Sequence, residues 1–346
     1  MDNSDIIDMS RTVEPPGVPM PRQLSRRTAL AGLGAVLLAG CTDRPVFPAV
    51  PDLPDGTETP NPEPVPSVTV TAATGEVEVP GAPVRVVVLD TAELDSAFTL
   101  GIPPVGAARA PADRELPDYW PASWLERIGI VGDIGSPDGA RIAALTPELI
   151  LSNQTRDGAH YDTLRAIAPT VLSRTTGFPW KENFQLHAQA LSRQAQAAAV
   201  IAEYGRHVGR ATRAIGDAGS GGKRISLVRF VEGSPTVRLY GKQNFPGTLL
   251  ADLQLGRPDP QNVDQFAVEV PPDRIAQADG DYLFYSTYGD PAKAGTDAVL
   301  AGAGWQALGA VKAHRAFPVD DQLWYQGIGY TGANLILAEL QRLLGA

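Results

Sequence analysis

An arginine stands in the middle of an apolar stretch that reads "ISLVRFV" from Ile225 to Val231. Valine and isoleucine are the residues that a strand feeding a core usually carries, so Arg229 either is a solvated edge residue or points at an anionic group. The following stretch, "TVRLYGKQNFPG", adds Arg238, Tyr240 and Asn244, and the two stretches together predict a β-hairpin. Guanidinium, phenol and amide groups gathered in this way can hold an anionic or polar ligand through hydrogen bonds.

The composition bounds the classes of protein to which this chain can belong. Of its 346 residues, 43% are hydrophobic, which is enough for one large or two medium domains with their own cores. The formal net charge is −10. A nucleic-acid-binding protein would carry a basic stripe, and the sequence has none, so we expect no nucleic-acid partner.

The N-terminal region reads as an export signal that ends at a lipid attachment site. Residues 21–41, "PRQLSRRTALAGLGAVLLAGC", combine a basic segment, a short apolar stretch and small residues before Cys41, the only cysteine. An apolar stretch this short is typical of a signal peptide rather than of a membrane-spanning helix. "SRRTAL" resembles a twin-arginine signal and "LAGC" resembles the lipobox of bacterial lipoproteins. We therefore expect residues 1–40 to be a signal peptide and Cys41 to carry the lipid.

A proline-rich segment follows this cysteine. Eight of the 26 residues from Thr42 to Ser67 are proline, which predicts an extended tether without a core of its own. We assign residues 41–75 to this tether and expect the exported protein to be anchored by Cys41 to the outer face of the cytoplasmic membrane. Four acids in the first 19 residues are unusual ahead of such a signal, and we interpret Met20 as the true start.

Beyond the tether, helices and strands alternate. The apolar run "VRVVVL" (Val84–Leu89) is typical of a strand buried on both faces, and the units after it predict an α/β lobe with a mostly parallel sheet. The 35 residues from Glu182 to Gly216 contain no proline and predict one helix of about 50 Å, a strut between two lobes. We place the first lobe at residues 76–185, the interdomain helix at 186–216 and the second α/β lobe at 223–346.

Several sequence patterns that could indicate other chemistry are weak here. "GIGYTG" (Gly327–Gly332) matches the dinucleotide pattern G-x-G-x-x-G, but that fingerprint needs an acid about 20 residues further on, so we interpret it as a helix start. The chain has no nucleotide-binding P-loop and no G-x-S-x-G nucleophile motif. Its four histidines are scattered, so we expect neither catalysis nor direct metal binding.

Five stretches, in this order, carry a family resemblance: "PVRVVVLDTAELDSAFTLGIPPVG", "IAALTPELIL", "LRAIAPTV", "RLYGKQNFPGTLLADLQLGRP" and "AFPVDDQLWYQGIGYTGANLILAEL". From Val79 to Ala346 the chain resembles the substrate-binding lipoproteins of iron–siderophore ABC importers. The resemblance implies two Rossmann-like lobes joined by a rigid helix, with the ligand in the cleft between them and modest closure on binding. It implies a ferric siderophore as ligand, no other cofactor, ABC permease subunits as partners, and a monomer.

A receptor for such a chelate needs cationic or hydrogen-bonding groups and aromatic walls around a wide cleft. Ligands of α/β lobes sit beyond the carboxyl ends of the strands, and that rule selects the candidates. They are Arg109, Trp180, Arg229, Arg238, Tyr240, Asn244, Tyr285, Tyr288, Trp324 and Tyr325. Adjacent aromatics in a loop are not expected to face one core, which favours Trp324 and Tyr325 as ligand contacts. The three arginines favour an anionic chelate, whereas the aromatic residues also suit a neutral hydroxamate.

The family usually carries one glutamate on each lobe that meets arginines of the permease. The first of these positions falls near Ala140, where only Asp138 is close, and Glu269 and Asp273 lie in the matching region of the second lobe. Two alternatives stay open. The cargo is haem or a corrinoid, with Tyr240, Tyr288 or Tyr325 as an axial ligand, or the chain is an envelope lipoprotein that has lost import.

Overall fold

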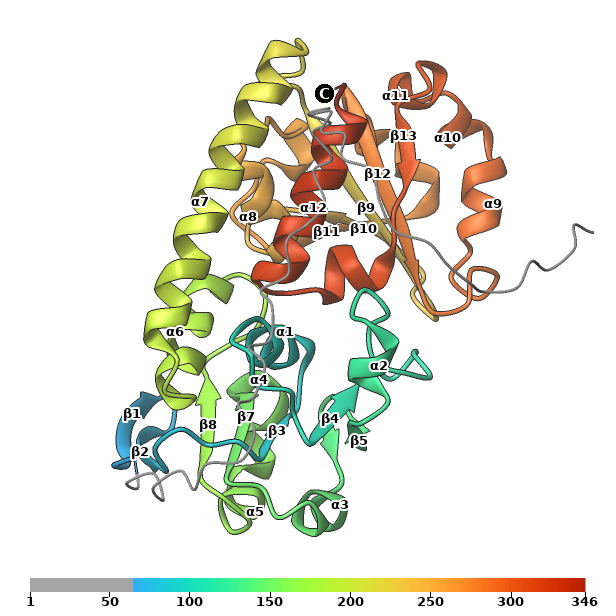
Figure 1. The fold of residues 1–346 in the computed structure, drawn as a ribbon. Helices are drawn as coiled ribbons and strands as arrows, with labels where there is room; N and C mark the ends of the chain where they lie inside the picture. The colour runs from blue at the N-terminus through green and yellow to red at the C-terminus, as the bar shows by residue number, and fades with distance from the viewer. Residues whose placement is uncertain (1–64, 346) are drawn as a thin grey trace, which may run out of the picture. The chain divides into compact units, whose positions relative to one another are not determined.

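The computed structural model describes residues 65–345, which begin with a two-stranded hairpin and a six-stranded sheet (Figure 1). The sheet has the order β6-β5-β4-β3-β7-β8 and is parallel except for β6. The elements of this first lobe are β1 (Val68–Ala72), β2 (Gly75–Val79), β3 (Val86–Val88), α1 (Thr91–Thr99), β4 (Gly106–Arg109), α2 (Ala122–Leu125), β5 (Gly129–Asp133), β6 (Ser136–Pro137), α3 (Gly139–Ala144), β7 (Leu149–Asn153), α4 (Gln154–Asp157), α5 (Tyr161–Arg165) and β8 (Thr170–Ser173). Every residue of the central strands β3 and β7 is buried, as the apolar run predicts for a strand covered on both faces, and so is every residue of the edge strand β8.

A five-stranded sheet forms the second lobe, in the order β11-β10-β9-β12-β13. The first two strands in sequence, β9 and β10, pair antiparallel, so the expected hairpin is present, while β9, β12 and β13 run parallel. The elements are β9 (Ile225–Val231), β10 (Val237–Tyr240), α8 (Phe245–Asp252), β11 (Ala267–Val270), β12 (Tyr282–Tyr288), α9 (Thr296–Ala301), α10 (Ala303–Gln306), α11 (Gly309–Lys312), β13 (Ala316–Pro318) and α12 (Tyr330–Leu343). The fold class is therefore α/β with two lobes, as predicted.

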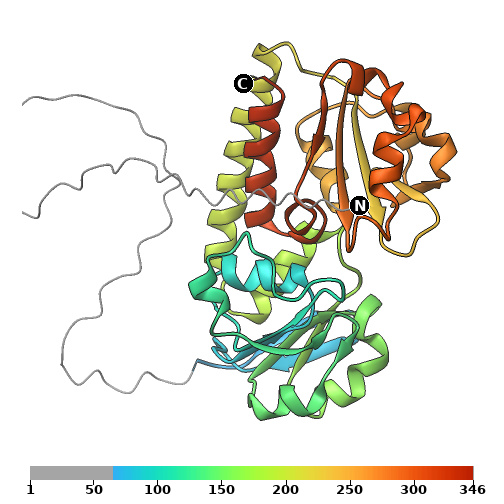
Figure 2. The same cartoon turned by 90° about the vertical axis from the view of Figure 1, so that its right-hand side faces the viewer.

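Two helices, rather than the single strut expected over residues 186–216, connect the lobes: α6 (Trp180–Ala190) and α7 (Gln194–Asp217). The break falls at Ser192, whose φ of 55° is left-handed and ends a helix. The backbone N–H groups of Ser192 and Arg193 turn back to the carbonyls of Gln189 and Ala188. At 24 residues, α7 is about 36 Å long, and it packs against α6 at one end and α12 at the other (Figure 2).

One hydrophobic cluster runs through both lobes. It joins Val88 and Leu151 of the first sheet to Leu227 and Phe284 of the second, by way of buried residues on α1, α6, α7 and α12 such as Leu337. Because burial of apolar surface is the main stabilising term in folding, a large rotation of the lobes would expose part of this cluster. The shared cluster therefore favours a modest change of cleft width over a wide opening.

The start of α12 explains the glycine pattern of residues 327–332. The Asp95 carboxylate, from α1 of the other lobe, accepts hydrogen bonds from the backbone N–H groups of Thr331 (3.2 Å) and Gly332 (3.0 Å). A Cβ atom at Gly329 would collide with Asp95 Oδ1. The interpretation as a helix start is confirmed, and the anion at this helix end is a side chain of the protein itself. Burial raises the pKa of Asp95 to about 6, although these hydrogen bonds partly oppose the shift.

The ordered sheet structure begins before residue 76. Strand β1 starts at Val68, and Ala73 donates to the carbonyl of Leu172 at the end of the first sheet. Residues 68–75 therefore belong to the first lobe rather than to the tether. The proposed signal peptide, Cys41 and most of the tether lie outside the described residues. Within residues 65–345, no helix has the length and apolar character needed to cross a bilayer.

Replacement of Gly332 by alanine should lower the free energy of unfolding by about 2–3 kcal/mol, because overpacking against a backbone atom cannot be relieved by a rotamer change. The added Cβ would collide with the carbonyl oxygen of Gly327. Gly205→Ala is the matched control, since a Cβ added at this exposed position of α7 would meet nothing within 4 Å. We expect it to stabilise by about 0.5–1 kcal/mol. Urea unfolding measures the stability of both variants. Equal effects of the two changes would contradict the close packing of Gly332 against Gly327.

Candidate functional site

A row of polar side chains crosses one face of the second sheet. Arg229 on β9 lies directly opposite Arg238 on β10 and Ser286 on β12, and Arg238 lies opposite Glu269 on β11. Residues that face each other across neighbouring strands project to the same side of a sheet. Both arginines therefore share a face, which strand alternation within the sequence could not establish.

Arg229 is held in a bidentate ion pair with Asp321. Its Nε donates to Asp321 Oδ1 at 2.7 Å and its Nη2 to Asp321 Oδ2 at 2.5 Å, and each side chain is only 11% exposed. The remaining Nη1 donates to the phenol oxygen of Tyr240 at 3.2 Å. Burial by itself lowers the pKa of Arg229, but Tyr240 and Asp321 together outweigh it, so the pKa is raised and the guanidinium stays charged.

Two tyrosine rings lie close to this guanidinium. The carbon at its centre lies 4.8 Å from the ring centroid of Tyr288 and 4.9 Å from that of Tyr325, within cation–π range. Tyr325 also packs on Tyr240 at 4.6 Å between centroids. The anionic group at which the arginine of the apolar strand points is thus a carboxylate of this chain.

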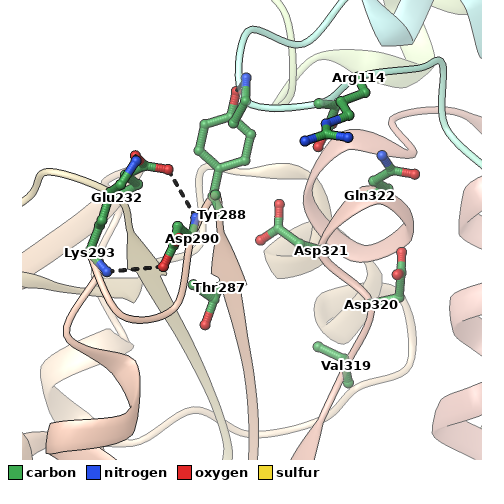
Figure 3. A pocket seen from close by; sticks show the side chains of 13 residues that line it. Arg114, Glu232, Thr287, Tyr288, Asp290, Lys293, Val319, Asp320, Asp321 and Gln322 are labelled. Carbon is green, nitrogen blue, oxygen red and sulfur yellow. Dashed lines mark hydrogen bonds and ion pairs between the residues drawn. The ribbon is translucent and has the colours of Figure 1, made fainter.

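A pocket of about 640 Å³ lies beside this cluster, between the two lobes. The first lobe contributes residues 112–114, which follow β4, and the second contributes the ends of β9 and β12 and the segment after β13. The lining residues are Ala112, Asp113, Arg114, Glu232, Thr287, Tyr288, Gly289, Asp290, Lys293, Val319, Asp320, Asp321 and Gln322 (Figure 3). The pocket therefore occupies the carboxyl ends of strands from both sheets, where ligands of α/β folds are expected.

Two hydrogen bonds join the lobes at this pocket. The backbone N–H of Ala112 donates to the phenol oxygen of Tyr288 at 3.1 Å. The backbone N–H of Asp118 donates to Gln322 Oε1 at 3.0 Å. Both donors belong to the loop after β4, so the closeness of this loop to the second lobe sets the width of the pocket.

Carboxylates dominate the wall of the pocket. Five acids line it, namely Asp113, Glu232, Asp290, Asp320 and Asp321, against two cationic side chains, Arg114 and Lys293. Glu232 pairs with Lys293 at 2.9 Å, and Figure 3 shows this pair and Asp290 on one side of the pocket, with Asp320, Asp321 and Gln322 on the other. Burial raises the pKa of both Asp113 and Asp320 above the usual range.

The structure places Arg109, Arg238 and Tyr288 near the cleft, but both arginines are engaged. Arg109 ends β4, pairs with Asp133 at 2.9 Å and donates to the carbonyl of Arg114 at 2.7 Å, so it supports the loop that lines the pocket. Arg238 pairs with Glu269 at 2.7 Å beside the ring of Phe266. Only Tyr288, of the ten candidates, lines the pocket itself.

The other candidates are packed inside the protein. Trp180 is 2% exposed and donates to Thr248 Oγ1 at 2.8 Å. Asn244 caps α8 by accepting from the N–H of Gly247, and Tyr285 projects to the opposite face of the sheet, where it packs on Trp305. These three side chains therefore have structural partners, and the expectation that they face the cleft is not met in this structure.

The expectation that Trp324 and Tyr325 do not both face one core is wrong, because both belong to the hydrophobic cluster that the lobes share. A π-helical turn over Gln322–Gln326 directs Trp324 onto Phe284 and Tyr325 onto Tyr240, and both side chains are buried. Tyr240 and Tyr325 stay next to Arg229 beneath the cleft, whereas Trp324 donates to Glu339 of α12 at 2.6 Å.

The residues expected to meet a permease have different surroundings. Asp138 caps α3 by accepting from the N–H groups of Ala140 and Arg141. Glu269 accepts from Thr236 and Arg238, and Asp273 is exposed at the start of a 3₁₀ segment. Docking at these three positions stays a prediction.

Sequence reasoning missed the acids of the site. Asp320 and Asp321 lie within three residues of the end of β13 and Asp113 lies in the loop after β4, so the rule that ligands sit beyond strand ends points to them as well as to Arg109. The ten candidates are cationic, amide and aromatic side chains, so these three acids are not among them. Among residues 65–345, no group of three or more histidine, cysteine or acidic side chains is arranged to hold a metal ion.

Comparisons with known proteins agree with this architecture. The family model described as "Periplasmic binding protein" matches residues 86–323. "Probable siderophore-binding lipoprotein YfiY" of Bacillus subtilis (strain 168) is 33% identical over 274 residues, which are 76% of this chain and 83% of that protein. "Fe(3+)-citrate-binding protein YfmC" of the same organism is 26% identical, over 73% of this chain and 79% of its own length.

A solved structure gives the same result for the fold. The crystal structure of Staphylococcus aureus SirA complexed with staphyloferrin B matches with a TM-score of 0.72 and 26% identity. The match covers 80% of this chain and 98% of that one.

Breaking the Arg229–Asp321 pair from either side should destabilise the fold by about 3–5 kcal/mol, because the remaining charge is left buried without its partner. Arg229→Met and Asp321→Asn remove one member each. The double variant should lose clearly less stability than the two single losses added together. Urea unfolding of the four proteins measures this coupling, and strictly additive effects would show that the two charges do not depend on each other.

Proposed function

The chain belongs to the family of periplasmic binding proteins, and from this premise we propose that it captures a ferric siderophore between its lobes and delivers it to the permease of an ABC importer. The observation that carries the proposal is the pocket between the lobes, at the carboxyl ends of strands from both sheets. No bond is made or broken in this function. The protein binds its cargo and releases it.

Several observations support this cargo and this location. The names of the relatives refer to siderophores and to Fe(3+)-citrate, which favours an iron chelate over haem, a corrinoid or the loss of import. The word "lipoprotein" in one of those names supports an extracytoplasmic protein anchored to a membrane. We also propose that Cys41 carries the lipid. Asp138, Glu269 and Asp273 are proposed as contacts with the permease.

The geometry suggests how capture would proceed. The hydrogen bonds from Ala112 to Tyr288 and from Asp118 to Gln322 join the lobes across the pocket, so they must break as the cleft widens and form again as it closes. The hydrophobic cluster that both lobes share keeps this movement small. A permease would then recognise the closed, loaded protein by contacts with the outer surface of the two lobes.

Quenching of tryptophan fluorescence tests the function directly. The mature protein should show saturable quenching by at least one member of a panel of ferric hydroxamates, ferric catecholates and ferric citrate. The iron-free chelators serve as controls. Saturable binding of haem or cobalamin and of no ferric siderophore would contradict the proposal, and so would the absence of any binding.

Two variants of one strand locate the binding site within this experiment. Tyr288→Phe removes the phenol oxygen that accepts from Ala112 and should weaken binding by about fivefold, the effect of about one hydrogen bond. Tyr282→Phe is the matched control, since Tyr282 lies on the same strand and its phenol bonds to Ser220, away from the pocket. If both changes weaken binding equally, the ligand does not bind in the pocket beside Tyr288.

A further inference from the structure

We propose that Asp321 is an internal counter-ion that occupies the anion site of Arg229, so that the cleft takes neutral or cationic ferric chelates and discriminates against anionic ones. This inference rests on the proposed function and names the class of chelate. It reverses the expectation that the arginines of the cleft favour an anionic ligand.

Asp321 occupies the carboxylate-binding edge of Arg229 that is formed by Nε and Nη2, and the arginine side chain is only 11% exposed. A guanidinium binds a carboxylate best through two parallel hydrogen bonds, and Asp321 makes both of them, at 2.7 and 2.5 Å. The third nitrogen donates to Tyr240, and the ring centroids of Tyr288 and Tyr325 lie 4.8 and 4.9 Å from the carbon at the centre of the guanidinium. An anionic ligand would therefore have to compete with Asp321 for this arginine.

Asp321 is itself held in place. Ser286 Oγ donates to its Oδ1 at 2.7 Å, and Gln326 Nε2 donates to its Oδ2 at 3.3 Å. Ser286 stands beside Arg229 in the row across the sheet, and Gln326 comes from the π-helical turn that also carries Tyr325. Displacement of Asp321 would therefore break contacts with two further elements and leave two buried charges apart.

The other charged side chains of the pocket are also mostly negative, like Asp321. Asp113, Asp290 and Asp320 also line it, and Glu232 already neutralises Lys293. Five carboxylates and two cationic side chains line the pocket, and Arg229 beside it is paired with Asp321. A ligand with net negative charge would meet like charges on both sides of the pocket, a recognised means of rejecting unwanted partners.

The net charge of a ferric chelate depends on its iron-binding groups, so the negative charge of the pocket favours one class of chelate. Three hydroxamate groups, each with one negative charge, neutralise Fe³⁺. Catecholates and citrates bring more negative charge than the metal can balance. The structure thus points to ferric trihydroxamates, including those with a free ammonium group, which could approach the acidic wall of the pocket.

A single chelate scaffold with three different charges gives the sharpest test. Ferrioxamine B has a free ammonium group, its N-acetyl derivative is neutral, and its N-succinyl derivative ends in a carboxylate. All three hold iron in the same way. Titration by tryptophan quenching at low salt should rank them cationic, then neutral, then anionic, with about tenfold between the first and the last, since like charges placed together weaken binding.

The variant Asp321→Asn isolates the residue responsible. It frees the fork of Arg229 and removes one negative charge, so it should tighten the succinyl derivative by about tenfold while the neutral form changes little. Asp281→Asn is the matched control, because Asp281 pairs with Arg224 on the same lobe and does not line the pocket. Melting temperatures without ligand verify folding. If Asp321→Asn does not fold, Asp320→Asn, which also lines the pocket, should shift the ranking in the same direction.

The outcomes separate the two proposals. A wild-type protein that binds the succinyl derivative most tightly, or a ranking that neither variant changes, would overturn the role of Asp321 while the siderophore function stands. Tighter binding of an anionic ferric catecholate or ferric citrate than of every trihydroxamate would also overturn the role of Asp321 and leave the siderophore function standing. Binding of no ferric chelate at all would overturn the proposed function and this inference together.

Discussion

A guanidinium buried in an apolar strand must have its charge compensated, and much of the cleft is arranged around that requirement. Asp321 supplies the compensation, and Ser286, Gln326 and Tyr240 complete the hydrogen bonds of the pair. To place Asp321 there, the chain after β13 has to turn back over the sheet, and the π-helical turn that does so also brings Tyr325 onto Arg229. The floor of the cleft is thus an ion-paired polar cluster rather than an open basic site.

Another carboxylate, Asp95, links the two lobes. Asp95 reaches from α1 to the first turn of α12, and Gly329 leaves the room that this approach requires. Together with the hydrophobic cluster that both lobes share, this contact fixes the first lobe against the last helix. A receptor built in this way recognises its cargo mainly by the shape and charge of a largely preformed cleft, and less by a wide domain movement.

Local patterns predicted those parts of the fold that depend on neighbours in the sequence. The apolar run at Val86–Val88, the β9–β10 hairpin and the start of α12 belong to this group. The break at Ser192 could not be predicted in the same way, because serine is not a residue that normally marks a left-handed helix end. The partner of Arg229 lies 92 residues away in the sequence, and no spacing rule identifies it. Trp324 and Tyr325 were misjudged because a π-helical turn directs adjacent side chains differently from an ordinary loop.

A crystal structure of the protein with a bound ferric trihydroxamate tests the central claim most directly. The anomalous signal of iron should lie between the lobes, beside Tyr288 and Asp321, and the two hydrogen bonds between Arg229 and Asp321 should persist beneath it. Iron bound outside this pocket would contradict the account. So would an acidic group of the ligand on Arg229 with Asp321 turned away.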